Sequence, residues 1–183
     1  MFRVVLGAAI ACACACASSP AAVHPAPTAP VASAASSSPA SSPASLLTPA
    51  SPDELRKLLA APGAKATLVN VWATWCEPCV KEFPDVLRAG RDAKARGVRT
   101  MFVSADFESE RSNAEAFLAK QGVDFTSYVK TGDDQAFIDA LSKSWSGSIP
   151  ATMIYDAQGN LRFFREGEID YAGVTAALDS VLE

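Results

Sequence analysis

The histidine and cysteine side chains that hold zinc are scarce in this sequence. The chain of 183 residues has one histidine, His24, and five cysteines, of which only Cys76 and Cys79 lie beyond residue 50. A structural zinc site needs four ligands, so these two cysteines cannot complete one within a single chain. We therefore expect no metal site and no cofactor.

Positive charge is also scarce. Arg3 is the only Lys, Arg, Asp or Glu side chain before Asp53. Once Arg3 is set aside, 15 basic residues stand against 20 acidic ones, a net charge of −5. A nucleic-acid partner normally requires a basic face on the protein. The composition therefore argues against nucleic-acid binding.

An apolar run long enough to cross a membrane is missing as well. The run from Val4 to Ala17 has 14 residues, whereas a bilayer-spanning helix needs about 20. A short apolar run after a positive charge is typical of a secretory signal. We predict that residues 1–17 are an export signal and that the protein works on the periplasmic side of the membrane.

The cysteines within that signal leave two forms of processing open. Cys12, Cys14 and Cys16 alternate with alanine at 11–17, and a cysteine after a small residue resembles the site at which bacterial lipoproteins receive their lipid. We favour this lipoprotein signal, which would tether the protein to the membrane. The alternative is cleavage at a small-residue site such as 15–17, which would release a soluble protein.

The rest of the chain divides into a linker and a domain. Residues 18–50 are almost entirely Ala, Pro, Ser and Thr. Such a segment buries too little apolar surface to offset its chain entropy, so we expect a disordered linker. Residues 51–183 suit one compact domain, which we expect to be monomeric.

Helical and β-rich patterns alternate along this domain. Helices are expected at 52–59, 76–96, 112–121, 133–143 and 171–182, and strands at 66–73, 98–105, 124–129, 152–156 and 161–165. The first strand is apolar on both faces, which is typical of the centre of a sheet, and the second is also expected to be buried. The last two form a hairpin. This order predicts an α/β fold with a mixed β-sheet flanked by helices.

Cys76 and Cys79 form a Cys-X-X-Cys pair where a strand leads into a helix. Such a pair is a redox dithiol, half of a zinc site or a chance occurrence. The lack of further ligands argues against zinc, and an exported protein works where disulfides form. We therefore predict a redox-active pair.

The position of each sulfur predicts its role. Cys76 lies where unpaired N–H groups and the helix dipole stabilise negative charge. Its thiol should therefore have a pKa below the value of about 8.5 of free cysteine, and we assign Cys76 as the nucleophile. Cys79, one turn further on, is the resolving thiol.

Two residues between the cysteines support the site. Pro78 stiffens the first turn without the loss of a hydrogen bond, because early helical N–H groups are unpaired. Glu77 leaves two interpretations open. Its carboxylate either opposes the Cys76 thiolate and makes the pair more reducing, or is a solvated acid favoured by the helix dipole.

The segments WATWCEPCVKEFP at 72–84 and GSIPAT at 147–152 resemble the thioredoxin superfamily, specifically its TlpA/ResA-like branch of exported bacterial thiol–disulfide oxidoreductases. The resemblance implies a thioredoxin fold over about 50–183, with the branch's helix–strand insertion at 112–129. It also implies that the Ile149–Pro150 peptide bond is cis and lies against the dithiol. The Ile149 backbone would pair with the substrate, and Trp75 would cover the cysteines as an exposed ring.

Asn70 departs from the pattern of plain thioredoxins. Those proteins carry a buried aspartate six residues before the first cysteine, whereas this position is neutral here. A direct proton acceptor for Cys79 is therefore missing, or Glu77 or water replaces it.

The resemblance favours an extracytoplasmic enzyme that reduces protein disulfides and is itself reduced by a membrane electron donor. Cytochrome c maturation is one typical role in this branch. A thiol peroxidase is an alternative, although the expected proline and threonine before a lone cysteine are absent. A second alternative is a redox-inert binding or chaperone module whose disulfide stays closed.

Overall fold

The computed structural model describes residues 45–183. The predicted export signal at 1–17, with Cys12, Cys14 and Cys16, lies outside the described residues, as does the predicted linker up to residue 44. Among residues 45–183, no helix is both long enough and apolar enough to cross a bilayer.

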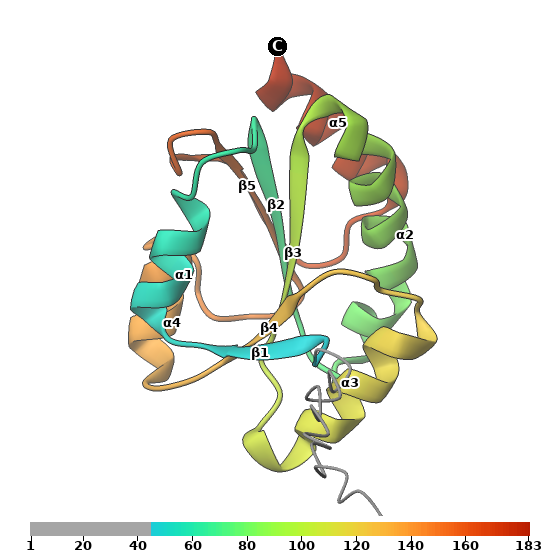
Figure 1. Cartoon of the computed structure of the whole chain (residues 1–183), viewed down its shortest axis with the longest axis vertical. Coiled ribbons are helices and arrows are strands. Elements are labelled where there is room, and N and C mark those ends of the chain that lie inside the picture. The colour runs from blue at the N-terminus through green and yellow to red at the C-terminus, as the bar shows by residue number, and fades with distance from the viewer. Residues whose placement is uncertain (1–44) are drawn as a thin grey trace, which may run out of the picture. The chain divides into compact units, whose positions relative to one another are not determined.

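A mixed sheet forms the centre of the fold (Figure 1). Its six strands lie in the order β1-β4-β3-β2-β5-β6. Strands β1, β4, β3 and β2 run parallel to one another, whereas β5 is antiparallel to both β2 and β6. The strands are β1 (Leu47–Ala50), β2 (Ala66–Trp72), β3 (Val98–Ser104), β4 (Ser127–Lys130), β5 (Ala151–Asp156) and β6 (Leu161–Glu166).

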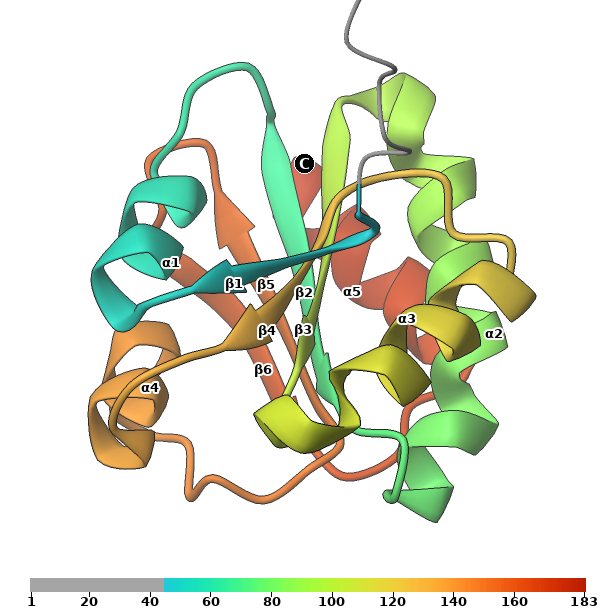
Figure 2. The same ribbon diagram turned by 60° about the horizontal axis from the view of Figure 1, so that its bottom comes forward.

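Helices cover both faces of this sheet. One face is covered by α1 and α4 and the other by α2, α3 and α5, as Figures 1 and 2 show from two directions. The helices are α1 (Pro52–Leu59), α2 (Glu77–Ala93), α3 (Arg111–Lys120), α4 (Asp134–Leu141) and α5 (Tyr171–Leu182). The predicted α/β class is confirmed, and every predicted helix and strand is present with boundaries shifted by three residues or fewer.

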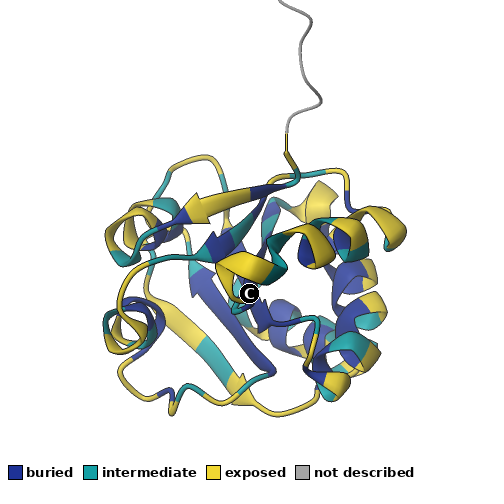
Figure 3. Cartoon of the chain, turned by 90° about the horizontal axis from the view of Figure 1, so that it is seen from below, coloured by how far each residue is buried: buried dark blue, intermediate teal, exposed yellow. Residues whose placement is uncertain are grey.

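Strand β2 separates two apolar cores. All of its residues are buried, and the centre of the sheet is dark blue in Figure 3, whereas the outer surfaces of the helices are mostly exposed. Leu68 and Trp72 pack with residues of α2 and α5, while Val69 and Val71 pack with residues of α1 and α4. Because side chains alternate along a strand, Asn70 shares the α2 face with Leu68 and Trp72.

Strand β1 corrects the predicted domain boundary. Leu47–Ala50 was expected to be linker, but it pairs in parallel with β4 at the edge of the sheet. Leu47 and Ala50 are buried, and Thr48 and Pro49 are exposed. An edge strand tolerates proline because only one of its sides is paired. The fold therefore begins before residue 51.

The loops that carry the predicted site residues meet at one end of the sheet. β2 ends at Trp72 and leads into α2, whose N-cap is Cys76. β3 ends beside it, where the Ala105 N–H donates to the Trp72 carbonyl at 2.7 Å. Strand β5 begins at the same end, because Ala151 pairs with Val71 in the antiparallel register.

Candidate active site

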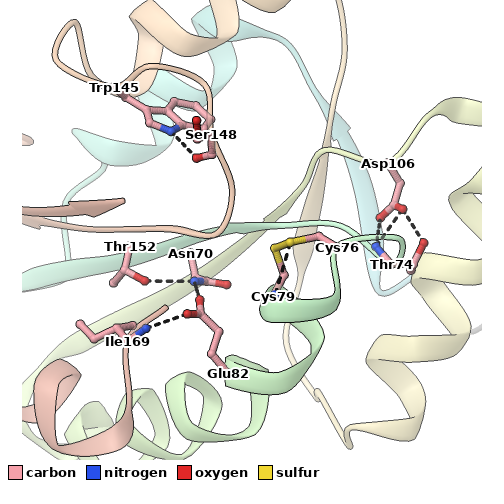
Figure 4. The surroundings of a disulfide bond; sticks show 10 residues. All are labelled: Asn70, Thr74, Cys76, Cys79, Glu82, Asp106, Trp145, Ser148, Thr152 and Ile169. Carbon is pink, nitrogen blue, oxygen red and sulfur yellow. Dashed lines mark hydrogen bonds between the residues drawn. A yellow bond between two sulfur atoms is a disulfide. The ribbon is translucent and has the colours of Figure 1, made fainter. Parts of the chain in front are cut away.

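Cys76 and Cys79 form a disulfide at the N-terminus of α2 (Figure 4). Their Cα atoms lie 5.2 Å apart. Cys79 is fully buried, whereas Cys76 keeps 6% of its surface exposed. A sulfur atom that approaches from solvent therefore reaches Cys76 first.

The start of α2 is built to favour negative charge on the Cys76 sulfur. Cys76 Sγ accepts a hydrogen bond from the Cys79 backbone N–H at 3.3 Å. Backbone N–H groups and the helix dipole stabilise an anion at this position. Pro78 lies in the first turn, where its missing N–H costs no helical bond, and Glu77 is exposed there.

A buried carboxylate holds the loop that precedes Cys76. Asp106, which is 1% exposed, accepts hydrogen bonds from the Thr74 N–H at 3.0 Å and from the Thr74 hydroxyl at 2.5 Å. The Ser104 hydroxyl donates to its other oxygen at 2.6 Å. Asp106, just after β3, therefore fixes the backbone two residues before Cys76.

The loop before β5 has the predicted cis bond. The Ile149–Pro150 peptide bond is cis. The Trp145 indole N–H donates to the Ser148 carbonyl at 2.7 Å, so this tryptophan anchors the loop in addition to packing against Phe137. The loop is thus held from β5 on one side and from the segment after α4 on the other.

An apolar cavity of about 250 Å³ lies between this loop and Trp75, the residue that precedes Cys76. Trp75 and Ile149 both line it, and Trp75 is 56% exposed, as predicted. The other apolar lining residues are Ala105, Phe107, Phe137, Ile138, Trp145 and Gly147. Its polar lining is the ion pair of Lys130 and Asp134. This surface suits an apolar segment of a partner protein.

Glu82 is a buried carboxylate that the sequence analysis did not select. It lies three residues after Cys79 on α2 and is 4% exposed. Its two oxygens accept hydrogen bonds from Asn70 Nδ2 at 2.8 Å and from the Ile169 N–H at 2.9 Å. Burial raises the pKa of Glu82 above the ordinary value of 4.5, and these two hydrogen bonds only partly oppose the shift.

Glu82 also has a route to solvent. It lines a cavity of about 440 Å³ between α2, β6 and the start of α5. Lys81 and Glu168, which form an ion pair at 2.7 Å, lie at the same cavity. A proton on Glu82 can therefore exchange with water without passing over the face of the dithiol.

Glu77 and water were the predicted substitutes for a proton acceptor of Cys79, and Glu82, which lies on the same buried face of α2 as Cys79, was not among them. A signal for Glu82 was present in the sequence. Positions 79, 82, 83 and 86 lie on one face of a helix, and three of the four residues there are apolar. Asp106 gave no comparable signal, because its partner Thr74 lies on another loop.

Among residues 45–183, no group of three or more His, Cys, Asp or Glu side chains is arranged to hold a metal ion.

Comparison with known proteins agrees with this geometry. Residues 32–178 match the Redoxin family model. The chain belongs to the Redoxin family. It is 35% identical over 107 residues to the thiol:disulfide interchange protein DsbE of Allochromatium vinosum, a match that covers 58% of this chain and 54% of that protein. It is 30% identical over 97 residues to the thiol-disulfide oxidoreductase ResA of Bacillus subtilis, covering 53% of this chain and 50% of that protein.

The solved structures place this Redoxin-family chain in the thioredoxin fold. A thioredoxin-family thiol:disulfide interchange protein from Chlorobium tepidum superposes with a TM-score of 0.57 at 25% identity, covering 66% of this chain and 82% of that one. The predicted thioredoxin fold and the resemblance to ResA-like proteins are confirmed. The chain matches about half of the length of the two named relatives.

Proposed function

We propose that this chain is a thiol–disulfide oxidoreductase that works outside the cytoplasm and reduces disulfides in other proteins. The observation that carries the proposal is the difference between its two sulfurs. Cys76 reaches the surface at a helix N-terminus, and Cys79 is fully buried behind it. Thiol–disulfide exchange needs one sulfur that meets the partner and one that releases it. The two relatives, a thiol:disulfide interchange protein and a thiol-disulfide oxidoreductase, support the same activity.

The reaction begins with both cysteines reduced. The Cys76 thiolate attacks one sulfur of the substrate disulfide, so that a mixed disulfide forms and the other substrate sulfur leaves as a thiolate. The Cys79 thiolate then attacks the Cys76 sulfur and displaces the second substrate sulfur. Two electrons pass to the substrate, which ends as a dithiol, and the Cys76–Cys79 disulfide is restored. An external dithiol donor, expected in the membrane, then returns the two electrons.

We assign Glu82 as the group that accepts the proton of the Cys79 thiol. Cys79 is buried, and its thiol must lose a proton before it attacks. Glu82 lies one helical turn away, and burial raises its pKa above the ordinary value of a glutamate, which makes the carboxylate a stronger proton acceptor. The cavity beside Lys81 then lets that proton leave while a substrate covers Cys76.

Substrate binding is assigned to the surface around Trp75 and Ile149. The cavity between them is lined mainly by apolar side chains. An extended segment whose cysteine reaches Cys76 would place a neighbouring apolar side chain in that cavity. Pairing of the segment with the Ile149 backbone would set its direction.

Trapping the mixed disulfide tests the proposal. In Cys79→Ser the resolving sulfur is missing, so we expect extracytoplasmic proteins to remain attached to Cys76 and to be released by dithiothreitol. The matched control is Cys76→Ser, which retains a buried thiol and should capture none. If wild type reduced no protein disulfide and Cys79→Ser captured no partner, a redox-inert binding module would replace this function.

Two further measurements separate the remaining alternatives. A reduction potential close to the thioredoxin value of about −270 mV would agree with exchange, whereas a value well below about −300 mV would indicate a structural disulfide. Consumption of hydrogen peroxide at a rate comparable to that of disulfide reduction would favour a thiol peroxidase.

Export and membrane attachment are part of the same proposal. The support is the sequence of residues 1–17 and the linker that follows. Mass spectrometry of protein from a bacterial membrane fraction should find lipid on Cys12, Cys14 or Cys16. A free amine at Ser18 would instead show cleavage without an anchor.

Apocytochrome c is the substrate that we test first, because the ResA-like resemblance implies this role. A peptide with an oxidised Cys-X-X-Cys pair should be reduced faster than a peptide with an unrelated disulfide of equal length. Equal rates would remove this specificity and leave the general reductase.

A further inference from the structure

Asn70 has an oxygen atom with no hydrogen-bond partner. The residue lies on β2 and is fully buried. Its Nδ2 donates to Glu82 at 2.8 Å and to the Thr152 hydroxyl at 3.0 Å. Among residues 45–183, no donor reaches its Oδ1. Buried polar atoms are nearly always paired, so an exception in a well-packed core calls for an explanation.

The contacts of Nδ2 determine where the oxygen points. A carboxylate accepts hydrogen bonds, so the amide atom that faces Glu82 is the nitrogen. The oxygen then lies on the other side of the amide, and Figure 4 draws it toward the Cys76–Cys79 disulfide. Asn70 shares its sheet face with Trp72, which packs in the same core as Cys79. The unpaired oxygen therefore faces the buried sulfur.

The oxidation state of Cys79 explains why that oxygen is unpaired. In the disulfide, Cys79 Sγ carries no hydrogen and cannot donate. When the disulfide is reduced, two electrons and two protons convert it into two thiols, and the Cys79 S–H becomes a donor. The reduced protein thus supplies the partner that the oxidised protein lacks.

We propose that Asn70 is a positioning residue whose Oδ1 accepts a hydrogen bond from the Cys79 thiol in the dithiol state. This inference rests on the proposed redox function and deepens it. The amide holds the thiol with its oxygen and Glu82 with its nitrogen, so it keeps the resolving sulfur close to its proton acceptor. Asn70 itself takes up no proton. During resolution the Cys79 proton passes to Glu82, and the hydrogen bond to Oδ1 is lost as the S–S bond closes.

The S–H stretching band in the infrared spectrum reports this hydrogen bond directly. In Cys76→Ser, Cys79 is the one thiol of residues 45–183. The spectrum of the double variant Cys76→Ser, Cys79→Ser is subtracted from the spectrum of Cys76→Ser. The difference contains the band of Cys79 alone, because any thiol nearer the N-terminus contributes equally to both spectra. We expect the band at the lower frequency of a hydrogen-bonded thiol, and at the frequency of a free thiol when Asn70→Ala is added.

Two matched variants separate this contact from a general disturbance of the core. Asn70→Asp keeps an acceptor oxygen and should retain the low-frequency band. Ser127→Ala removes another buried side-chain oxygen that has no partner among the described residues. Ser127 lies on β4, two strands away from β2, so this variant should leave the band unchanged.

The same hydrogen bond should favour the dithiol over the disulfide. A thiol is a weak donor, so we expect Asn70→Ala to shift the equilibrium with glutathione about threefold toward the disulfide. This corresponds to about 15 mV for a two-electron couple. No shift in Asn70→Ala would contradict the inference.

One result would overturn the inference even before any Asn70 variant is made. It is an S–H band at the frequency of a free thiol in Cys76→Ser, in which Asn70 is unchanged. That result would leave the proposed function standing if wild type still reduced protein disulfides and Cys79→Ser still trapped partners. Failure of those two assays would instead remove the proposed function.

Discussion

Replacement of Glu82 by glutamine should slow the second step of the reaction and leave the first unchanged. The first step, attack by Cys76 on the substrate, takes place at the surface. The second step needs deprotonation of Cys79, which is fully buried. Glutamine has nearly the shape of glutamate but accepts no proton. Loss of a general base typically costs about 10²–10⁴-fold in rate, and we expect about 10²-fold because water in the neighbouring cavity can partly replace the carboxylate.

The structure also predicts a cost in stability for this variant. Asn70 Nδ2 and the Ile169 N–H both donate to the carboxylate. Glutamine offers one oxygen, so one of the two donors loses its acceptor. A buried donor without a partner costs about 1–3 kcal/mol, which urea unfolding of the oxidised protein can measure.

The assay follows a single turnover with a disulfide peptide. Samples are quenched with acid, and mass spectrometry separates the mixed disulfide from the released dithiol. In wild type, the resolution rate should rise with pH through the raised pKa of Glu82, because only the deprotonated carboxylate accepts a proton. Glu82→Gln should lack that rise, and the mixed disulfide should accumulate. Glu82→Asp, which keeps a carboxylate, is the control.

Resolution at the wild-type rate in Glu82→Gln, with an unchanged pH profile, would refute the assignment of Glu82. A slower first step with an unchanged second step would also contradict it, because the variant would then have disturbed Cys76 and not Cys79.

Four further outcomes are expected. Asp106→Ala leaves the donors of Thr74 and Ser104 without an acceptor. It should cost about 2–4 kcal/mol in urea unfolding, whereas an unchanged midpoint would show that water replaces the carboxylate. Ser51→Ala removes the capping box of α1 and should cost about 1 kcal/mol, measured by thermal unfolding. Glu77→Gln should lower the pKa of the Cys76 thiol if the neighbouring carboxylate opposes the thiolate; an unaltered pH profile of alkylation would leave Glu77 as a solvated acid. Because the folded state raises the pKa of Glu82, it binds more protons than the unfolded state between 4.5 and the raised value. Unfolding free energy should therefore fall as pH rises through that window, and Glu82→Gln should lack this component.

Most of the fold could be predicted from local patterns. The Cys-X-X-Cys pair between a strand and a helix has a single consistent arrangement, in which the first cysteine caps the helix. The buried strand β2 was recognisable because both of its faces are mainly apolar, and β3 because its second half is mainly apolar. The cis bond before Pro150 was implied by the resemblance of the loop to a known family and is present.

Strand β1 could not be predicted in the same way. Its four residues include a proline and follow a segment of similar composition. They form a strand because β4, distant in sequence, offers an unpaired edge. The identity of such a strand depends on its neighbour and not on its own residues.

The sequence by itself determined which two cysteines lie together at the start of a helix, because the order of strand, Cys-X-X-Cys and helix is a local pattern whose geometry follows from the start of a helix. Only the tertiary structure decided what surrounds the buried sulfur. Asn70, Glu82 and Ile169 come from β2, α2 and the segment before α5, and packing across the sheet brings them together. Hydrogen bonds between residues so far apart in the chain depend on how the layers pack, which no local pattern of residues encodes.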